Sequence, residues 1–221
     1  MNLKFAMSDR KQLESLLTPD RLDRLREVLG KRVANVTVVF ENLHKVHNLS
    51  AILRTCESFG IQEVHVVPQP GEGKVFRTVT QGCHRWLTIR RHPTVSSCFS
   101  MLREEGFRIL AGALAEKAVP LEQLDCTGKM ALVFSNELEG ASDEVLKQVD
   151  GFVAVPMAGF SQSLNVSVAA GIILYRVLRK KDREGDIERI SGEKVEKILD
   201  LWVRNSVRNV ELVLAELEAR K

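Results

Sequence analysis

The sequence lacks the features of several common protein classes. Its four cysteines are scattered, and no two are spaced as C-x-x-C, so neither a zinc knuckle nor a dithiol redox motif is indicated. No apolar run approaches the ~20 residues that cross a bilayer, and charged residues interrupt the first apolar positions, where a secretory leader has its core. We therefore expect no membrane contact, a cytoplasmic location and buried free thiols.

Two further motifs are missing. No G-x-G-x-x-G turn follows the first predicted strand, so a Rossmann-type cofactor site is not supported and a nucleotide-binding oxidoreductase is disfavoured. His44 and His47 lie close together, but no third and fourth ligand accompanies them, so we expect no metal.

What is present is the composition of an ordinary globular protein. The chain has 221 residues, 44% hydrophobic and 28% charged, enough for one well-buried domain with helical attachments. A net charge of +3 is too small to indicate a nucleic-acid partner, but residues 74–92 carry five lysines and arginines around Trp86 and no carboxylate. Basic residues beside an aromatic ring suit phosphates and exposed bases. A charged strand edge with Trp86 in the core explains the pattern equally well.

Hydrophobic periodicity predicts an α/β domain between two helical extensions. Residues 9–29 have the spacing of two helices divided at Pro19. Strands are predicted at 36–40, 63–67, 107–112, 130–134 and 152–155, and helices at 49–59, 94–105, 142–149 and 165–179. This alternation is typical of a mainly parallel sheet flanked by helices. One amphipathic helix over 195–217 is expected to cover the N-terminal helices or the main domain. The predicted boundaries are 1–35, 36–181 and 182–221.

The most informative stretch covers residues 155–171. Here a short apolar strand stops at Pro156, a polar loop follows, and a helix begins. Ser163 and Asn165 occupy positions where N-caps are preferred, so the loop ends in unpaired helix N–H groups. Ligands of parallel sheets bind beyond the carboxyl ends of the strands, and polar segments follow Phe40, Phe134 and Val155 at such ends.

Three segments together resemble the three motifs of the SPOUT superfamily of RNA methyltransferases, in its TrmH branch. They are NLSAILRT at 48–55, FSNELEG at 134–140 and VPMAGFSQSLNVSV at 155–168. The resemblance covers roughly residues 36–180 and implies a C-terminal trefoil knot, S-adenosylmethionine as cofactor and a homodimer with residues 165–178 at its interface. The implied cofactor contacts are Gly112, Asn136, Glu137, Gly140, Val155, Met157 and Leu164. Ser135, Leu138 and Glu139 depart from the commonest form of the second motif.

The resemblance also implies methyl transfer to a ribose 2′-hydroxyl. Arg54 matches the family's essential arginine, and we expect it to stabilise the developing alkoxide and bind the neighbouring phosphate, because a guanidinium with a pKa above ~12 is a poor base. Asn48 is expected to orient Arg54 or the ribose, and Ser163 and Asn165 to position the cofactor tail, Arg54 or both. The alternative for Arg54 is a surface salt bridge with Glu57.

The expected substrate is tRNA, at guanosine 18 of the D-loop. The short helical N-terminus, single catalytic domain and helical C-terminus resemble the organisation of the tRNA enzymes, whereas related rRNA enzymes usually carry a larger N-terminal RNA-binding domain. An rRNA substrate, or a catalytically silent RNA-binding scaffold, remains the alternative. The residues expected to contact RNA are Lys45, His47, Arg77, Arg85, Trp86 and Arg90.

Overall fold

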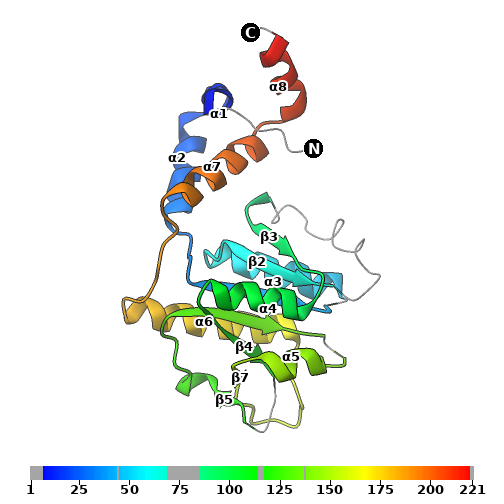
Figure 1. The fold of residues 1–221 in the computed structure, drawn as a ribbon. Helices are drawn as coiled ribbons and strands as arrows, with labels where there is room; N and C mark the ends of the chain where they lie inside the picture. The colour runs from blue at the N-terminus through cyan, green and yellow to red at the C-terminus, as the bar shows by residue number, and fades with distance from the viewer. Residues whose placement is uncertain (1–6, 44, 69–84, 114–116, 137, 220–221) are drawn as a thin grey trace. The chain divides into compact units, whose positions relative to one another are not determined.

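The computed structural model describes residues 7–43, 45–68, 85–113, 117–136 and 138–219 (Figure 1). Two compact units are present: Val33–Glu188 is one, and the terminal segments Met1–Arg32 and Arg189–Lys221 make up the other. Among the described residues, no helix combines the length and apolar character that a membrane span requires.

The larger unit is built on a seven-stranded sheet. Its strands are β1 (Val36–Glu41), β2 (Glu63–Val67), β3 (Thr88–Arg91), β4 (Phe107–Gly112), β5 (Val119–Pro120), β6 (Lys129–Phe134) and β7 (Gly151–Ala154). Their order is β3-β2-β1-β6-β4-β7-β5, and every neighbouring pair is parallel. The expected mainly parallel α/β class is confirmed. β3 and β5 were not among the predicted strands.

Helices cover both faces of this sheet. α3 (Val46–Ser58) and α6 (Val166–Arg183) pack on one face, where Phe40 and Phe134 are buried. α4 (Val95–Glu104) and α5 (Asp143–Gln148) pack on the other, where Ile109 is buried. Successive strand residues point to opposite faces, and because both faces are covered, nearly every residue of β1 and β6 is buried. A short 3₁₀ helix, Leu121–Gln123, follows β5.

Two imidazole rings interrupt the apolar layer beneath α4. His65 on β2 is fully buried, and its Nδ1 lies 3.0 Å from Nε2 of His92, just after β3. Burial, with the nearby His92 and Arg90, lowers the pKa of His65 to about 3, and burial lowers the pKa of His92 as well. Both rings are therefore neutral at physiological pH, and one donates a hydrogen bond to the other.

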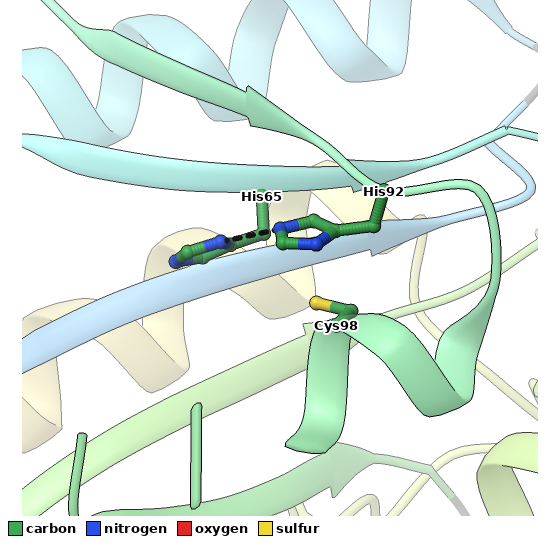
Figure 2. Close-up of side chains that lie close together, drawn as sticks. All are labelled: His65, His92 and Cys98. Atoms are coloured by element: carbon green, nitrogen blue, oxygen red, sulfur yellow. Dashed lines mark hydrogen bonds between the residues drawn. The ribbon is translucent and has the colours of Figure 1, made fainter. Parts of the chain in front are cut away.

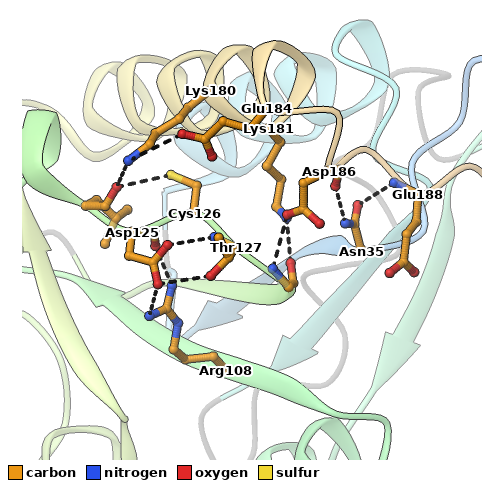
Figure 3. Close-up of polar contacts among 12 residues, drawn as sticks. Asn35, Arg108, Asp125, Cys126, Thr127, Lys180, Lys181, Glu184, Asp186 and Glu188 are labelled. Atoms are coloured by element: carbon orange, nitrogen blue, oxygen red, sulfur yellow. Dashed lines mark hydrogen bonds and ion pairs between the residues drawn. The ribbon is translucent and has the colours of Figure 1, made fainter.

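At the amino end of the sheet, a polar network closes the chain after α6 (Figure 3). The ammonium of Lys181, fully buried, pairs with Asp186 and donates to the carbonyl of Gly128 at 2.5 Å. Asn35 donates to the carbonyl of Asp186 at 2.6 Å and accepts from the N–H of Glu188 at 3.2 Å. These groups satisfy one another, as buried polar groups must if they are not to destabilise the fold.

The second unit contains α1 (Met7–Glu14), α2 (Pro19–Gly30), α7 (Glu193–Ser206) and α8 (Val210–Ala219). Thr18 caps α2 and Pro19 occupies its first turn, as predicted. Trp202 of α7 is buried, with the guanidinium of Arg32 4.9 Å from its ring centre. α7 packs against α1 and α2. Of the two partners expected for the C-terminal apolar stripe, the N-terminal helices are therefore the one that α7 covers.

The prediction of one continuous helix over residues 195–217 is wrong. The stripe is divided between α7 and α8. Asn209, immediately before α8, has a φ of 50°, a left-handed conformation that asparagine tolerates better than most residues. Apolar periodicity does not register such a break, because both helices present their apolar residues at the same spacing.

Candidate functional site

A pocket of about 730 Å³ opens at the carboxyl ends of β4, β6 and β7. Its volume lies within the range of small-molecule sites, about 300–1,000 Å³. The lining residues come from the ends of these strands, the segments that follow them, the loop before α3 and the first half of α6: Lys45, Gly112, Ala113, Phe134, Ser135, Asn136, Leu138, Glu139, Gly140, Ala141, Leu146, Val153, Ala154, Val155, Met157, Ser163, Leu164, Asn165, Val166, Ala169 and Ile173.

The predicted cofactor residues converge on this pocket. Six of them line it: Gly112, Asn136, Gly140, Val155, Met157 and Leu164. The seventh, Glu137, lies outside the described residues. Residues of the second and third motifs therefore meet at one edge of the sheet with Gly112 at the end of β4, because parallel strands carry their carboxyl ends to the same side.

Asn165 joins the pocket to α3. It is the N-cap of α6, and its Oδ1 accepts hydrogen bonds from the N–H of Ser167 at 2.9 Å and from the Ser167 hydroxyl at 2.6 Å. Its Nδ2 donates to Oδ1 of Asn48 at 3.1 Å. Asn48, buried in the first turn of α3, is thus held against the start of α6. Asn165 acts as a cap, as predicted, whereas Ser163 lies two residues before this cap and lines the pocket.

Asn136 orders the loop after β6. Its Oδ1 accepts from the N–H groups of Leu138 at 2.7 Å and Glu139 at 3.0 Å, and its Nδ2 donates to the carbonyl of Asn42 at 3.2 Å. The backbone N–H of Gly140 closes the turn on the Asn136 carbonyl at 3.0 Å, and Gly140 has a φ of 75°, which favours glycine. The shape of this pocket wall therefore depends on one asparagine side chain.

Asn42, which accepts a hydrogen bond from Asn136, is itself bonded to the buried carboxylate of Glu41. Asn42, after β1, has a φ of 50°, and its side chain donates to Oε1 of Glu41 at 2.7 Å. Glu41 is almost fully buried at the end of β1. These two residues link the loop before α3 to the loop after β6. Neither was predicted; the signal was an asparagine directly after a buried strand, which is a favoured left-handed position.

Arg54 lies on α3, six residues beyond Asn48, with its side chain exposed. It is not among the residues that line the pocket. Within the described part of the chain, no ion pair involves Arg54, so the surface salt bridge with Glu57 is not formed. The structure thus brings Asn48, Ser163 and Asn165 to the pocket region and leaves the guanidinium of Arg54 at the surface of α3.

The residues predicted to contact RNA fall into different settings. Lys45, exposed directly before α3, lines the pocket, and His47 is exposed in the first turn of α3. Arg85 is exposed and Trp86 is half-buried. Arg77 lies outside the described residues, as does His44.

Arg90 is engaged within the fold. Its Nε lies 2.9 Å from Glu63 and its Nη1 lies 3.1 Å from Glu105, so it links β3 to β2 and to the end of α4. This is the charged strand edge that the sequence left open as an alternative. An RNA contact by Arg90 stays a prediction.

Several lining residues were not predicted as site residues. Ser135, Leu138 and Glu139 form the wall that Asn136 orders, and Ala169 and Ile173 line the pocket from α6. Ala169 and Ile173 follow Asn165 by four and eight residues, the helical spacing of a single face. That spacing was available in the sequence, but small and aliphatic residues on a helix more often indicate packing than a ligand site.

Comparison with known proteins identifies the fold and the family. The profile described as the SpoU rRNA Methylase family matches residues 35–175. A Thermus thermophilus protein named tRNA (guanosine(18)-2′-O)-methyltransferase is 42% identical over 85% of this chain and 97% of its own length. An Escherichia coli protein of the same name is 34% identical over 76% of this chain and 74% of its own length.

Solved structures give the same result. The crystal structure of the Aquifex aeolicus TrmH/SpoU tRNA modifying enzyme superposes with a TM-score of 0.77 at 36% identity, and the match covers 90% of this chain and all of that one. An AdoMet-bound rRNA methyltransferase from Sinorhizobium meliloti has the same fold, with a TM-score of 0.60 at 24% identity over 71% of this chain and 60% of its own. The profile match over most of the chain and the near-complete relatives show that this chain belongs to the SpoU methylase family.

Proposed function

We propose that this protein transfers a methyl group from S-adenosylmethionine to the ribose 2′-hydroxyl of guanosine 18 in tRNA. The observation that carries the proposal is the pocket at the carboxyl ends of β4, β6 and β7, where residues of the second and third motifs meet beside Gly112. Relatives that bear this activity in their names are 33–42% identical over most of the chain. A tRNA substrate fits the expected cytoplasmic location.

The lining residues fit S-adenosylmethionine. The pocket combines apolar side chains, among them Met157 and Leu164, with the backbone of tight turns, and this mixture suits an adenine ring whose edge is read by N–H and C=O groups. A Cβ on Gly112 would come within 3.2 Å of the Phe134 ring, so a larger residue there would disturb the pocket wall. When bound, the cofactor supplies an activated methyl group on a sulfonium.

The chain's own residues align the acceptor. Arg54 binds the phosphate beside the target ribose and stabilises the negative charge that develops on the 2′-oxygen. A guanidinium is a poor base, so we assign the proton to an RNA phosphate oxygen held by Arg54. Asn48 and Asn165, hydrogen-bonded to each other, fix the start of α3 relative to the cofactor pocket. Positioning of this kind supplies a large part of the rate enhancement in transfer reactions.

RNA contacts are assigned to the side of the pocket formed by the loop before α3. Lys45 and His47 are both exposed there, and Lys45 is itself part of the pocket lining. Arg85 and Trp86, just before β3, provide a cation and an aromatic ring for a phosphate and a base. Arg77 is proposed to contact an RNA phosphate on the basis of the sequence alone.

A homodimer completes the site in this proposal. α6 exposes Val168, Ile172 and Tyr175, which are 49%, 39% and 54% exposed, on one helical face. The Tyr175 ring lies 6.1 Å from that of Phe59, at the end of α3. An apolar stripe of this kind suits a second copy of the chain. The partner would bring its Arg54 to the cofactor pocket, and the knot implied by the resemblance would form the pocket loops.

The dimer can be tested with Ile172→Glu. A charge in the apolar stripe should shift the protein to monomer in sedimentation velocity and abolish methyl transfer, while far-UV circular dichroism stays unchanged. Gln123→Glu, at an exposed position of the 3₁₀ helix, adds the same single negative charge outside the stripe and should leave the dimer intact. A fully active monomer would contradict the shared site.

The function is tested by incubating the full chain with unmodified tRNA transcripts and methyl-labelled S-adenosylmethionine. Nuclease digestion and mass spectrometry should place the label on the ribose of guanosine 18. A transcript with 2′-deoxyguanosine at that position lacks only the acceptor oxygen and should receive no label. Because the family profile is named for rRNA, ribosomal RNA fragments form a second arm. Label on rRNA alone would replace the tRNA assignment, and binding without any transfer would indicate a silent scaffold.

A further inference from the structure

Beneath α4, three potential ligand side chains gather from three separate segments (Figure 2). They are His65 of β2, His92 after β3 and Cys98 of α4, and one ligand atom from each lies within 4.8 Å of the others. All three lie on the sheet face covered by α4, and none of them lines the methyl-transfer pocket. We propose that His65, His92 and Cys98 form a metal site for Zn²⁺ or a similar thiophilic cation.

The geometry of the two histidines is close to that of a pair of zinc ligands. Nδ1 of His65 and Nε2 of His92 face each other at 3.0 Å. Two nitrogens bound to one tetrahedral zinc at 2.0–2.1 Å are about 3.3 Å apart. A cation can therefore replace the proton that the two rings share after a shift of a few tenths of an ångström.

Cys98 supplies the third ligand. With a Zn–S distance of about 2.3 Å, sulfur and nitrogen ligands are roughly 3.6 Å apart, so the thiol has to approach the rings by about 1 Å at most. Cys98 is fully buried in the first half of α4, with its side chain directed toward the histidines. Binding releases the thiol proton and forms one metal–sulfur bond and two metal–nitrogen bonds. The ring that donated the shared hydrogen bond moves its proton to its other nitrogen, so each histidine then carries one proton on the nitrogen away from the cation.

The carboxylate of Glu63 lies near the ring nitrogen of His65 that faces away from the proposed cation. Nε2 of His65 is buried and has no hydrogen-bond partner among the described residues, and Oε1 of Glu63 lies 3.6 Å from it. In metal sites the second ring N–H of a ligating histidine commonly donates to a carboxylate, which fixes the tautomer. Glu63 is placed to accept that proton when Nδ1 binds the cation.

Charge and access are compatible with a cation. The nearby Arg90 is neutralised by ion pairs with Glu63 and Glu105, and the thiolate of Cys98 adds a negative charge when it binds. His92 is half-buried, so the cluster is reachable from one side. Two imidazoles and a thiolate suit zinc, and the fourth position is left for water.

The sequence did not indicate this site, and we had expected no metal. His65 and Cys98 are 33 residues apart, and no two of the three have the short spacing of a zinc knuckle. The parallel pairing of β2 with β3 places His92 next to the end of β2, and α4 then returns over the sheet with Cys98. Bound zinc would tie β2, β3 and α4 together at this edge of the sheet.

The test uses the full chain, stripped with chelator and titrated with Co²⁺. We expect saturation at one equivalent per chain, with the intense visible bands of tetrahedral Co²⁺ and a thiolate-to-cobalt charge-transfer band that Zn²⁺ displaces. Cys98→Ser should lose the charge-transfer band, and His92→Gln should weaken Co²⁺ binding at least tenfold. Zn²⁺ should raise the midpoint temperature of thermal unfolding of the unaltered protein and leave that of Cys98→Ser unchanged.

Two control variants separate this cluster from two of the three other thiols. Cys56→Ser changes a thiol that is equally buried on the opposite face, and Cys83→Ser changes the cysteine outside the described residues. Both should keep the full cobalt spectrum. No saturable spectrum in the unaltered protein would overturn the proposal even if the variants fail to fold. A charge-transfer band that survives in Cys98→Ser would overturn it as well.

Discussion

The two ends of the parallel sheet use polar side chains in different ways. At the amino end, Lys181, Asp186 and Asn35 satisfy one another and the backbone of neighbouring segments, and the lysine is fully buried. At the carboxyl end, the side chains of Asn136 and Asn165 form hydrogen bonds that order the loops, and these loops line a pocket. One end fixes the fold, whereas the other holds a surface ready for a ligand.

This difference follows from the direction of the strands. All loops that begin at carboxyl ends meet at one edge, and their free N–H groups and side chains can face a common ligand. The amino end receives the chain returning from each helix, so buried polar groups there need internal partners. A substitution at one end should therefore affect mainly activity, and at the other mainly stability.

The largest effect is expected at Arg54. Arg54→Ala should lower kcat by roughly 10²- to 10³-fold, the cost of removing one group that stabilises transition-state charge. S-adenosylmethionine affinity, measured by calorimetry, should change less than twofold, because Arg54 is not part of the pocket lining. Arg108→Ala is the control at the amino end, where the guanidinium pairs with Asp125, and it should keep normal kcat. An active Arg54→Ala enzyme would remove this residue from the mechanism.

The next effect is on stability. Lys181→Met leaves Asp186 with an uncompensated, partly buried charge and should lower the free energy of unfolding by about 3 kcal/mol, measured by urea denaturation. Lys197→Met removes an exposed i,i+4 pair with Glu193 and should leave the free energy of unfolding nearly unchanged, because solvent screens such a pair. Methyl transfer by folded Lys181→Met protein should be close to normal. If both variants lost the same free energy of unfolding, the buried ion pair of Lys181 would stabilise the fold no more than the exposed pair of Lys197.

The smallest of the three effects tests the loop after β6. Asn136→Ala removes the acceptor for Leu138 and Glu139 and the donor to Asn42, so S-adenosylmethionine affinity should fall about tenfold, or about 1.4 kcal/mol. Asn136→Asp keeps the acceptor and loses only the donor, and its affinity should fall less. The measurement is calorimetric titration, with urea denaturation to record any stability change. Unchanged affinity in Asn136→Ala would show that the loop holds its shape without the side chain.

Most of the fold and much of the site could be predicted from the sequence. The strands at 63–67 and 107–112 have the predicted bounds because apolar residues predominate in both of these short segments. The pocket contains the predicted glycines and apolar residues because they belong to motifs at strand ends. β3 was missed because its four residues carry two arginines, and one of these, Arg90, is held by ion pairs that only the neighbouring elements supply.

The sequence by itself determined the order of the strands along the chain, the strand ends at which a ligand can bind, and the motif residues that mark the methyltransferase family. Periodicity and turn residues are local, so they can be read without the fold. Only the tertiary structure decided which distant side chains meet: Asn48 with Asn165, and His65 with His92 and Cys98. Those meetings depend on strand pairing and on how helices return over the sheet, and no spacing along the chain encodes them.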